Sequence, residues 1–272
     1  MIIVTGSKRS GTSLWMQILA AAGLPVIGER FPRGWGELLA AHNPDGYYES
    51  ELAAGIYHRT NPHPLTGAYL FPEQTRAHAV KVFVPGLIRS DVAFLDRVIA
   101  TVRAWPEHAA SVQRLRAALS DPTHDAALDL HPVLEWWTDI FALLRDLATR
   151  RYPAHVQSYQ ALLDDPERVI TEVLGWIGCG ERTTAIAAVH RAPPERPAAP
   201  PIDLPDGLDP AHLAAFDALY EQIHRGRPLS PTFVAHLNTI DADLRPLLLA
   251  HNARLRRSAL DRLHTSADET AP

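Results

Sequence analysis

The first thirteen residues of the chain, MIIVTGSKRSGTS, constrain its fold most strongly. A short apolar, β-branched run from Ile2 to Val4 leads into a loop bounded by Gly6 and Gly11, and a helical pattern has begun by Leu14. A strand, a glycine-bounded loop and a helix in this order direct loop N–H groups and the positive end of a helix dipole at one place. The sequence therefore predicts an α/β fold that begins with a phosphate-type anion site.

The loop departs from the pattern of nucleotide triphosphatases, GxxxxGK[ST]. The two glycines have the required spacing and Ser13 stands at the [ST] position, but Thr12 replaces the lysine that reaches the β- and γ-phosphates. The strands expected at 79–84 and 97–102 end in Pro85 and Arg103, and neither residue is the acid that would hold magnesium. We therefore expect an anion site that works without a metal. An ordinary glycine-containing turn between strand and helix is the alternative.

A second anion-binding element is expected after the strand at 97–102. Arg103 follows this strand, and Pro106 and Glu107 are typical of the first turn of a helix. Ser111 then lies about one and a half turns into that helix. Because ligands of open parallel sheets bind outside the carboxyl ends of the strands, Arg103 and Ser111 are candidates to hold a second phosphate. Taken alone, they also fit a surface arginine and a buried serine.

Four segments of the chain, in this order, carry a family resemblance: Arg9 to Leu14, Asn43 to Glu49, Arg103 to Ser111, and Ser158 to Glu167. They resemble segments of the sulfotransferases. The segment from Arg9 resembles the family's phosphosulfate-binding loop, and the segment from Asn43 is similar to a stretch found in many bacterial members. The segment from Arg103 resembles the family's 3′-phosphate-binding segment, and the segment from Ser158 resembles its Tyr-Glu-x-Leu-x-x-Asp-Pro stretch. The resemblance implies transfer of a sulfuryl group from 3′-phosphoadenosine-5′-phosphosulfate (PAPS) to an acceptor hydroxyl or amine, with 3′-phosphoadenosine 5′-phosphate (PAP) as product.

The resemblance also assigns roles to single residues. The cofactor would be bound by the loop and by the Arg103 segment, through Lys8, Arg9, Ser10, Gly11, Thr12, Ser13, Arg103 and Ser111. Arg9 would also act in catalysis, by neutralising the oxygen that leaves sulfur, although a guanidinium cannot donate its proton. The Arg-Lys-Gly segment with which the cytosolic members bind the 3′ side of the cofactor is not visible here.

The general base has to be found outside the cytosolic pattern, since Lys81 to Pro85 occupies the place of the Lys-Thr-His-Leu-Pro segment and contains no histidine. Glu29 is the first candidate, because the tyrosylprotein branch of the family has its acidic base at nearly the same offset. A structural ion pair of Glu29 with Arg30 or Arg33 is equally compatible with the sequence. The remaining candidates for the base are His42, Glu49 and His58.

Residues 29–75 are expected to form the acceptor side. They contain many aromatic residues among Pro, Gly, Asn and His, and pockets for small molecules have this character. Most of these aromatics also fit an irregular core, but Trp35 is our candidate for a wall of the pocket. The acceptor is expected to be a small molecule or a peptide.

The remaining pattern predicts a three-layer fold of the P-loop type, with a central parallel sheet flanked by helices and with additional C-terminal helices. Residues 1–200 would form the core and residues 201–272 a helical extension packed on it. Further elements are expected as helices at 12–23, 106–120, 131–150, 166–178, 183–190, 209–225 and 230–263, and as a strand near 155–158. The C-terminal helices could pack on the core or form a homodimer.

Composition excludes some classes of function. The net charge of −5 gives no argument for binding to nucleic acid or to an anionic membrane, and no apolar run approaches the length of a membrane span. One cysteine, Cys179, is expected to be a buried thiol and cannot form an intramolecular disulfide. Met1 leads directly into the first strand, so we expect no signal peptide and a cytoplasmic protein. No spacing of His or Cys predicts a metal site.

Two other classes of function fit parts of the sequence. A small-molecule kinase would use the same loop for ATP, although it would need magnesium ligands that the sequence does not offer. A non-catalytic protein with a sulfotransferase-like fold would keep the anion site and lack the base.

Overall fold

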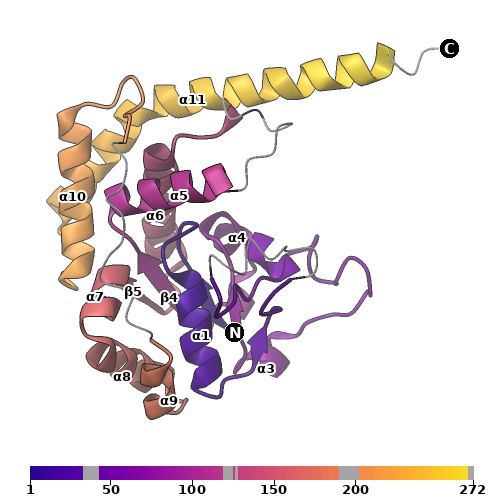
Figure 1. Cartoon of the computed structure of the whole chain (residues 1–272), viewed down its shortest axis with the longest axis vertical. Coiled ribbons are helices and arrows are strands. Elements are labelled where there is room, and N and C mark those ends of the chain that lie inside the picture. The colour runs from indigo at the N-terminus through magenta and orange to yellow at the C-terminus, as the bar shows by residue number, and fades with distance from the viewer. Residues whose placement is uncertain (33–42, 119–124, 126–127, 190–201, 269–272) are drawn as a thin grey trace.

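A parallel β-sheet lies at the centre of the molecule (Figure 1). The computed structural model describes residues 1–32, 43–118, 125, 128–189 and 202–268. In this part of the chain, the sheet has five strands in the order β2-β3-β1-β4-β5. The strands are β1 (Ile2–Thr5), β2 (Val26–Ile27), β3 (Ala79–Lys81), β4 (Arg97–Val102) and β5 (Ala154–Ser158). The predicted central parallel sheet is confirmed.

Helices flank the sheet; some connect its strands in the sequence and the others follow β5. They are α1 (Thr12–Ala21), α3 (Pro72–Thr75), α4 (Val84–Arg89), α5 (Trp105–Ala118), α6 (Pro132–Arg150), α7 (Tyr159–Asp164), α8 (Pro166–Ile177), α9 (Arg182–Ala187), α10 (Pro210–His224) and α11 (Pro231–Asp268). Two 3-10 turns accompany them, η1 (Glu51–Ala54) and η2 (Val92–Phe94). Among the described residues, no helix combines the length and the apolar character required to cross a bilayer.

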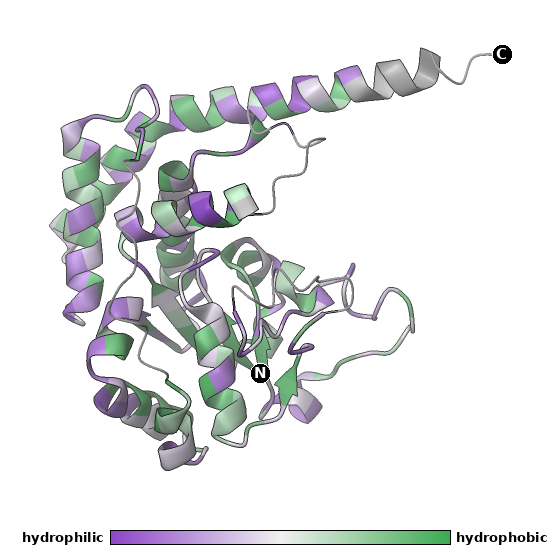
Figure 2. Ribbon diagram, in the orientation of Figure 1, coloured by the Kyte–Doolittle hydropathy of each residue, from purple (hydrophilic) through white to green (hydrophobic). Residues whose placement is uncertain are grey.

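The central strand β1 is apolar on both faces. Ile2 and Val4 pack into a cluster with residues of α1, α8 and α9, whereas Met1 and Ile3 pack into a second cluster with residues of α4 and α6. This alternation is the two-residue period of a strand whose two faces are both covered, as parallel sheets require. Figure 2 shows the apolar strands enclosed between the helix layers. The three-layer architecture follows from this double burial.

The sheet brings the two predicted anion-binding elements together. β1 pairs with β3 on one side and with β4 on the other. The chain leaves β1 towards β2 at one edge and leaves β4 towards β5 at the other edge. Adjacent strands whose connections run in opposite directions open a crevice at their carboxyl ends. The loop after β1 and the segment after β4 therefore meet at this crevice.

Local signals set the ends of several helices. The Asp165 side chain accepts a hydrogen bond from the Arg168 backbone at the start of α8, Pro166 occupies the first turn, and Gly178 ends the helix in a left-handed conformation. At the start of α10, Asp209 forms a capping box with His212. These local signals place helix boundaries close to those predicted.

The C-terminal helices share a hydrophobic cluster with the core. Phe216 of α10 stacks on Trp137 of α6, with ring centroids 4.8 Å apart, and lies 5.6 Å from Trp136. Leu237 and Leu244 of α11 belong to the same cluster. The C-terminal end of α11 projects away from the body of the molecule (Figure 1).

Two local predictions are wrong. The strand predicted at 79–84 ends at Lys81, because Val84 begins α4 with Pro85 in its first turn. Cys179 is exposed, although we expected it to be buried, because it follows the Gly178 that ends α8.

Candidate anion-binding site

The loop between β1 and α1 is compact and requires glycine at two positions. A Cβ atom on Gly6 would lie 2.4 Å from both Ser10 Oγ and the Thr101 carbonyl oxygen. Gly11 precedes α1 with a φ of 103°, and a Cβ there would lie 2.3 Å from the Tyr159 ring. The loop is thus packed directly on β4 and α7.

Some polar residues of the loop stabilise its conformation, and others have side chains that are not used within it. Ser10 is buried, and its backbone N–H and its hydroxyl both donate to the Ser7 carbonyl oxygen. Thr101 Oγ1 donates to the Ser10 carbonyl oxygen at 3.0 Å. Thr12 is buried, whereas Ser13 is partly exposed in the first turn of α1. The Ser10 hydroxyl is therefore used within the loop itself.

Arg9 joins the loop to helix α5. Its backbone adopts a left-handed conformation with a φ of 67°, which is uncommon for a residue other than glycine. Its Nε donates to Ser111 Oγ at 3.2 Å. The structure thus brings together two residues 102 positions apart, which we predicted to lie on the first and the second anion-binding element.

Arg103 is buried at the carboxyl end of β4, where it was predicted. Its Nη1 donates to the Arg9 carbonyl oxygen at 3.3 Å, and its Nε lies 3.1 Å from Glu107 Oε2. The guanidinium lies over the Tyr159 ring, 4.9 Å from the centroid. Trp136 Nε1 donates to the Arg103 carbonyl oxygen at 2.7 Å. The guanidinium and the backbone carbonyl group of Arg103 both have partners, so the orientation of the side chain is fixed.

The two guanidinium groups create a concentrated positive charge. Burial lowers the pKa of Arg9, Tyr47 opposes this change through its charge, and the nearby charge of Arg103 adds to the lowering. Tyr47 also has a side-chain hydrogen bond with Arg9. Because a guanidinium does not lose its proton in a protein, Arg9 stays charged. An anion placed here would relieve the repulsion between the two cations.

Lys81 and Glu49 extend the site to the other side of β1. Lys81 is 1% exposed, and its Nζ lies 2.6 Å from Glu49 Oε1. The same Nζ donates to the Tyr47 carbonyl oxygen at 2.5 Å and to Ser13 Oγ at 3.2 Å. Lys81 was not among the predicted site residues. A single lysine inside the apolar run 79–84 is the sequence signal that could have identified it.

The segment 43–49 is attached to α1 and carries Tyr47 and Glu49 to the site. Gln17 Nε2 of α1 donates to Asn43 Oδ1 at 3.2 Å and to the Gly46 carbonyl oxygen at 2.9 Å. Asn43 Nδ2 also donates to the Gly46 carbonyl oxygen, at 2.7 Å. These bonds hold the Asn-Pro-Asp-Gly turn against α1, directly before the two site residues.

Glu29 lies beside this segment, with its carboxylate exposed. Its backbone N–H donates to the Glu49 carbonyl oxygen at 3.0 Å, and the two residues form an isolated antiparallel bridge. His58 is also exposed, at the edge of the Tyr57 ring. The other candidates that the sequence offered for this side, His42 for the base and Trp35 for the pocket wall, lie outside the described residues.

Lys8 is exposed, and its charge acts on two acids of α6. The pKa of Asp139 is raised to about 7, mainly by burial and also by the charge of Glu135, while the charge of Lys8 opposes the rise. Glu135 also lies 3.2 Å from Nη2 of Arg116 on α5. Lys8 is therefore a loop residue whose charge also acts on Glu135 and Asp139 of α6.

His108 lies beneath the loop and is completely buried. Burial lowers the pKa of its ring to about 4, although backbone atoms of Lys8 and Pro132 near the ring oppose this change. Among the described residues, neither ring nitrogen makes a well-formed hydrogen bond. His108 is therefore a neutral packing residue at neutral pH and places no further charge under the anion site.

Helix α10 closes the site at β5. Ser158 Oγ and His224 Nδ1 share a hydrogen bond of 2.8 Å, and Trp105 Nε1 donates to Asp217 Oδ1 at 2.7 Å. Tyr220 has a side-chain hydrogen bond with Ser158 and is influenced by the charges of Glu107 and Arg103. The C-terminal extension thus contacts the residues that surround Arg103.

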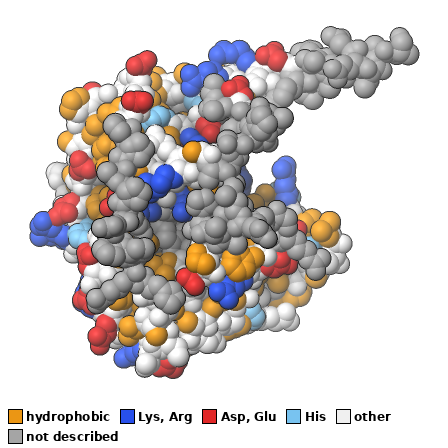
Figure 3. Space-filling view, viewed as in Figure 1, with side chains coloured by type: hydrophobic (Ala, Val, Ile, Leu, Met, Phe, Trp, Pro, Cys, Tyr) orange, Lys and Arg blue, Asp and Glu red, His pale blue; other side chains and the backbone are white. Residues whose placement is uncertain are grey.

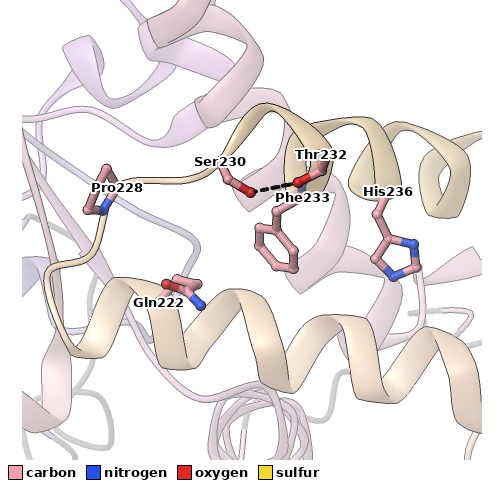
Figure 4. Close-up of a pocket in the computed structure, with 6 residues that line it drawn as sticks. All are labelled: Gln222, Pro228, Ser230, Thr232, Phe233 and His236. Carbon is pink, nitrogen blue, oxygen red and sulfur yellow. Dashed lines mark hydrogen bonds between the residues drawn. The ribbon is translucent and has the colours of Figure 1, made fainter.

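The surface is hollowed near the middle of the face shown in Figure 3, where Lys and Arg side chains gather near the N-terminal end of α1. A separate pocket of about 470 Å³ lies between the end of α10 and the start of α11 (Figure 4). Phe233 lines this pocket, and its ring lies between Gln222 and His236 in the view shown. This pocket contains none of the residues of the anion site.

Comparison with known proteins adds no family. No protein-family model matches the chain, and no curated protein matches its sequence. Within the described residues, no group of three or more His, Cys, Asp or Glu side chains is arranged to hold a metal ion. The chemistry of the site must therefore be argued from its own residues.

Proposed function

We propose that this protein is a sulfotransferase that moves a sulfuryl group from PAPS to a hydroxyl or amine of an acceptor. The observation that carries the proposal is the hydrogen bond from Arg9 to Ser111, with Arg103 bonded to the backbone of Arg9. The resemblance assigns these three residues to the two phosphate-bearing ends of the cofactor. Their convergence at the carboxyl ends of β1 and β4 supports that assignment.

The residues present fit such a cofactor. The loop requires glycine at positions 6 and 11 and ends at the N-terminus of α1, which favours a phosphate-type anion. Arg9 and Ser13 would hold the 5′ side, and Arg103 with Ser111 would hold the 3′-phosphate. Four cations near one loop, Lys8, Arg9, Lys81 and Arg103, suit a ligand with two anionic ends.

The chain's own residues would then divide the work of transfer. The bound cofactor supplies an activated sulfuryl group. Arg9 neutralises the negative charge that develops on the leaving oxygen, and it cannot donate a proton because guanidinium stays charged. Lys81 adds a second cation at the first turn of α1. Glu29, the base implied by the resemblance, lies on the segment that pairs with residue 49.

The proposal keeps the broader expectations from the sequence. The acceptor would be a small molecule or a peptide, bound on the side of residues 29–75. A cytoplasmic location and a homodimer formed through the C-terminal helices belong to the same proposal. The resemblance offers no role for nucleic acid or membrane.

Calorimetric titration with PAP, without metal, tests the proposal. We expect binding of PAP in preference to Mg–ATP, and we expect Arg9→Ala to abolish turnover of PAPS. Binding of Mg–ATP alone would contradict the proposal and favour a kinase. Binding of PAP without transfer to any acceptor would favour a non-catalytic binding protein.

A further inference from the structure

The ion pair between Lys81 and Glu49 is placed where a structural pair is costly. Lys81 is 1% exposed and Glu49 is 16% exposed, so both charges have lost most of their water. A pair of this kind costs several kcal/mol of desolvation per ion and often stabilises no more than apolar residues of the same volume. Burial lowers the pKa of Lys81, and the Glu49 charge and hydrogen bond oppose this effect. We therefore look for a function of the Lys81–Glu49 pair other than stabilisation of the fold.

The pair lies at the N-terminus of α1. Lys81 Nζ lies 3.2 Å from Ser13 Oγ, and Ser13 is in the first turn of the helix that faces the proposed anion. An anion bound at this helix end would attract Lys81 and repel the carboxylate of Glu49. Glu49 and the anion therefore compete for one ammonium group.

We propose that Glu49 is the group that takes the proton of the acceptor, and that Lys81 is shared between Glu49 and the bound anion. This inference rests on the proposed sulfotransferase function. Glu49 is favoured over Glu29 because its carboxylate is held by Lys81 beside Ser13, whereas the carboxylate of Glu29 is exposed. Glu29 and Glu49 pair with each other in an isolated antiparallel bridge. The two candidates for the base are therefore neighbouring residues.

Sulfuryl transfer exchanges one sulfur–oxygen bond for another. The acceptor oxygen gives its proton to a carboxylate oxygen of Glu49 and forms a bond to sulfur. The bond between sulfur and the oxygen of the 5′-phosphate breaks, and its electron pair stays on that phosphate oxygen. Arg9 and Lys81 stabilise the charge that develops there. Protonated Glu49 then releases its proton to water, and sulfated acceptor and PAP leave.

The titratable groups around Glu49 come from four segments. Lys81 on β3 contacts the Glu49 carboxylate, and Tyr47 interacts with Glu49 through charge. Arg9, on the loop after β1, acts on Tyr47 and Lys81, and Glu29 pairs with Glu49 through its backbone. Burial raises the pKa of Tyr47, the Arg9 charge opposes this, and the Glu49 charge adds to the rise. Tyr47 therefore stays protonated at neutral pH and is a poor base.

The first test measures affinity and does not depend on turnover. Titration of Glu49→Gln with PAP should show binding about tenfold tighter than in the wild type, because a negative charge beside the anion has been removed and Lys81 no longer pairs with a carboxylate. Glu29→Gln is the matched control and should change affinity by less than about twofold, because exposed charges are screened. Equal effects in the two variants would overturn the sharing of Lys81.

The second test uses phenol and 4-nitrophenol as acceptors with PAPS at pH 8. Phenol keeps its proton at this pH and 4-nitrophenol is largely ionised, so only phenol needs a base. Glu49→Gln should lower turnover of phenol by about 10²–10⁴-fold and leave turnover of 4-nitrophenol within about tenfold of the wild type.

A folding control separates structure from chemistry. Glu49→Gln leaves a buried ammonium without its partner, and Glu49→Asp keeps the charge but retracts it by one methylene group. Glu49→Asp should therefore bind PAP like the wild type and still lose at least about tenfold on phenol.

Equal losses on both phenols, or a selective loss on phenol in Glu29→Gln, would overturn the assignment of Glu49. Wild-type protein that binds PAP but transfers to neither phenol would also overturn it. Absence of PAP binding in the wild type would instead refute the sulfotransferase proposal itself.

Discussion

Arg103 is the best-fixed cation of the site. Glu107, the Arg9 carbonyl and the Tyr159 ring hold its guanidinium, and Trp136 holds its backbone. A side chain fixed in this way loses little entropy on binding an anion, so most of its charge-assisted contact would appear as affinity.

We therefore expect Arg103→Ala to weaken PAP binding by about 2 kcal/mol. Arg97→Ala provides the control, because Arg97 begins the same strand at the opposite end. Isothermal calorimetry of both variants checks the prediction. An unchanged dissociation constant in Arg103→Ala would show that the second phosphate is held elsewhere.

Asp139 gives a prediction about pH. Its pKa lies at about 7 in the folded protein, against an ordinary value of 3.8, so the folded state keeps a proton that the unfolded chain releases between these values. The free energy of unfolding therefore falls as pH rises through this window, and the penalty persists above pH 7. Asp139→Asn should remove the penalty.

Because Asp139 is partly exposed, we expect a gain of about 1–2 kcal/mol at pH 8 and little change at pH 4. Urea denaturation of Asp139→Asn at both pH values measures this difference. Asp243→Asn, an exposed position on α11, is the control. A gain of equal size at both pH values would contradict the assignment.

At the scale of elements, Gly11 connects the loop, α1 and α7. A side chain there faces two obstacles, a φ of 103° and the Tyr159 ring at 2.3 Å. Gly11→Ala should therefore abolish PAP binding and lower stability by more than about 1 kcal/mol.

Gly23→Ala separates the two obstacles. Gly23 has a φ of 85°, and a Cβ there would meet no atom within 4 Å. It should show the backbone cost alone, about 1 kcal/mol, with PAP affinity unchanged. Thermal unfolding and titration of both variants make the comparison. Equal destabilisation would mean that the Tyr159 ring moves aside.

The sequence predicted elements best where local signals decide them. The strand 97–102 has the predicted bounds, and Pro106 lies in the first turn of α5 as expected. The strand predicted at 79–84 ended early, because the apolar pattern continues from β3 into α4 without a change in hydrophobicity. Periodicity alone cannot separate a short buried strand from a helix that follows it directly.

The site was predictable where a residue follows a strand. Arg9, Arg103 and Ser111 converge as expected, because parallel strands align their carboxyl ends. The Lys81 and Glu49 pair was not predictable, since it depends on how the segment 43–49 is attached to α1 through Gln17. Such side-chain contacts across long stretches of sequence leave no periodic signal.

At the scale of the whole molecule, the C-terminal helices complete a core begun by α5 and α6. Phe216 is completely buried against Trp136 and Trp137. Phe216→Ala should lower the free energy of unfolding by about 3–5 kcal/mol. Guanidinium denaturation measures it, with Phe233→Ala at the rim of the α10–α11 pocket as control.

If residues 201–272 formed an independent unit, Phe216→Ala would produce a second unfolding transition and leave the main one in place. A single transition shifted to lower denaturant concentration is the expected outcome, because the aromatic cluster joins both parts of the chain.

The place of β1 in the sheet sets a condition on synthesis. Ile2 pairs with Ala79 on one side and with Arg97 on the other, so β1 is made before both of its neighbours and waits for them. At about 5–20 residues per second, the wait for β4 lasts roughly 5–20 s. Until Lys81 has been made, β1 has neither of its partner strands, and from then until Val102 has been made it has only β3. One edge of this apolar strand therefore stays unpaired until translation has passed Val102.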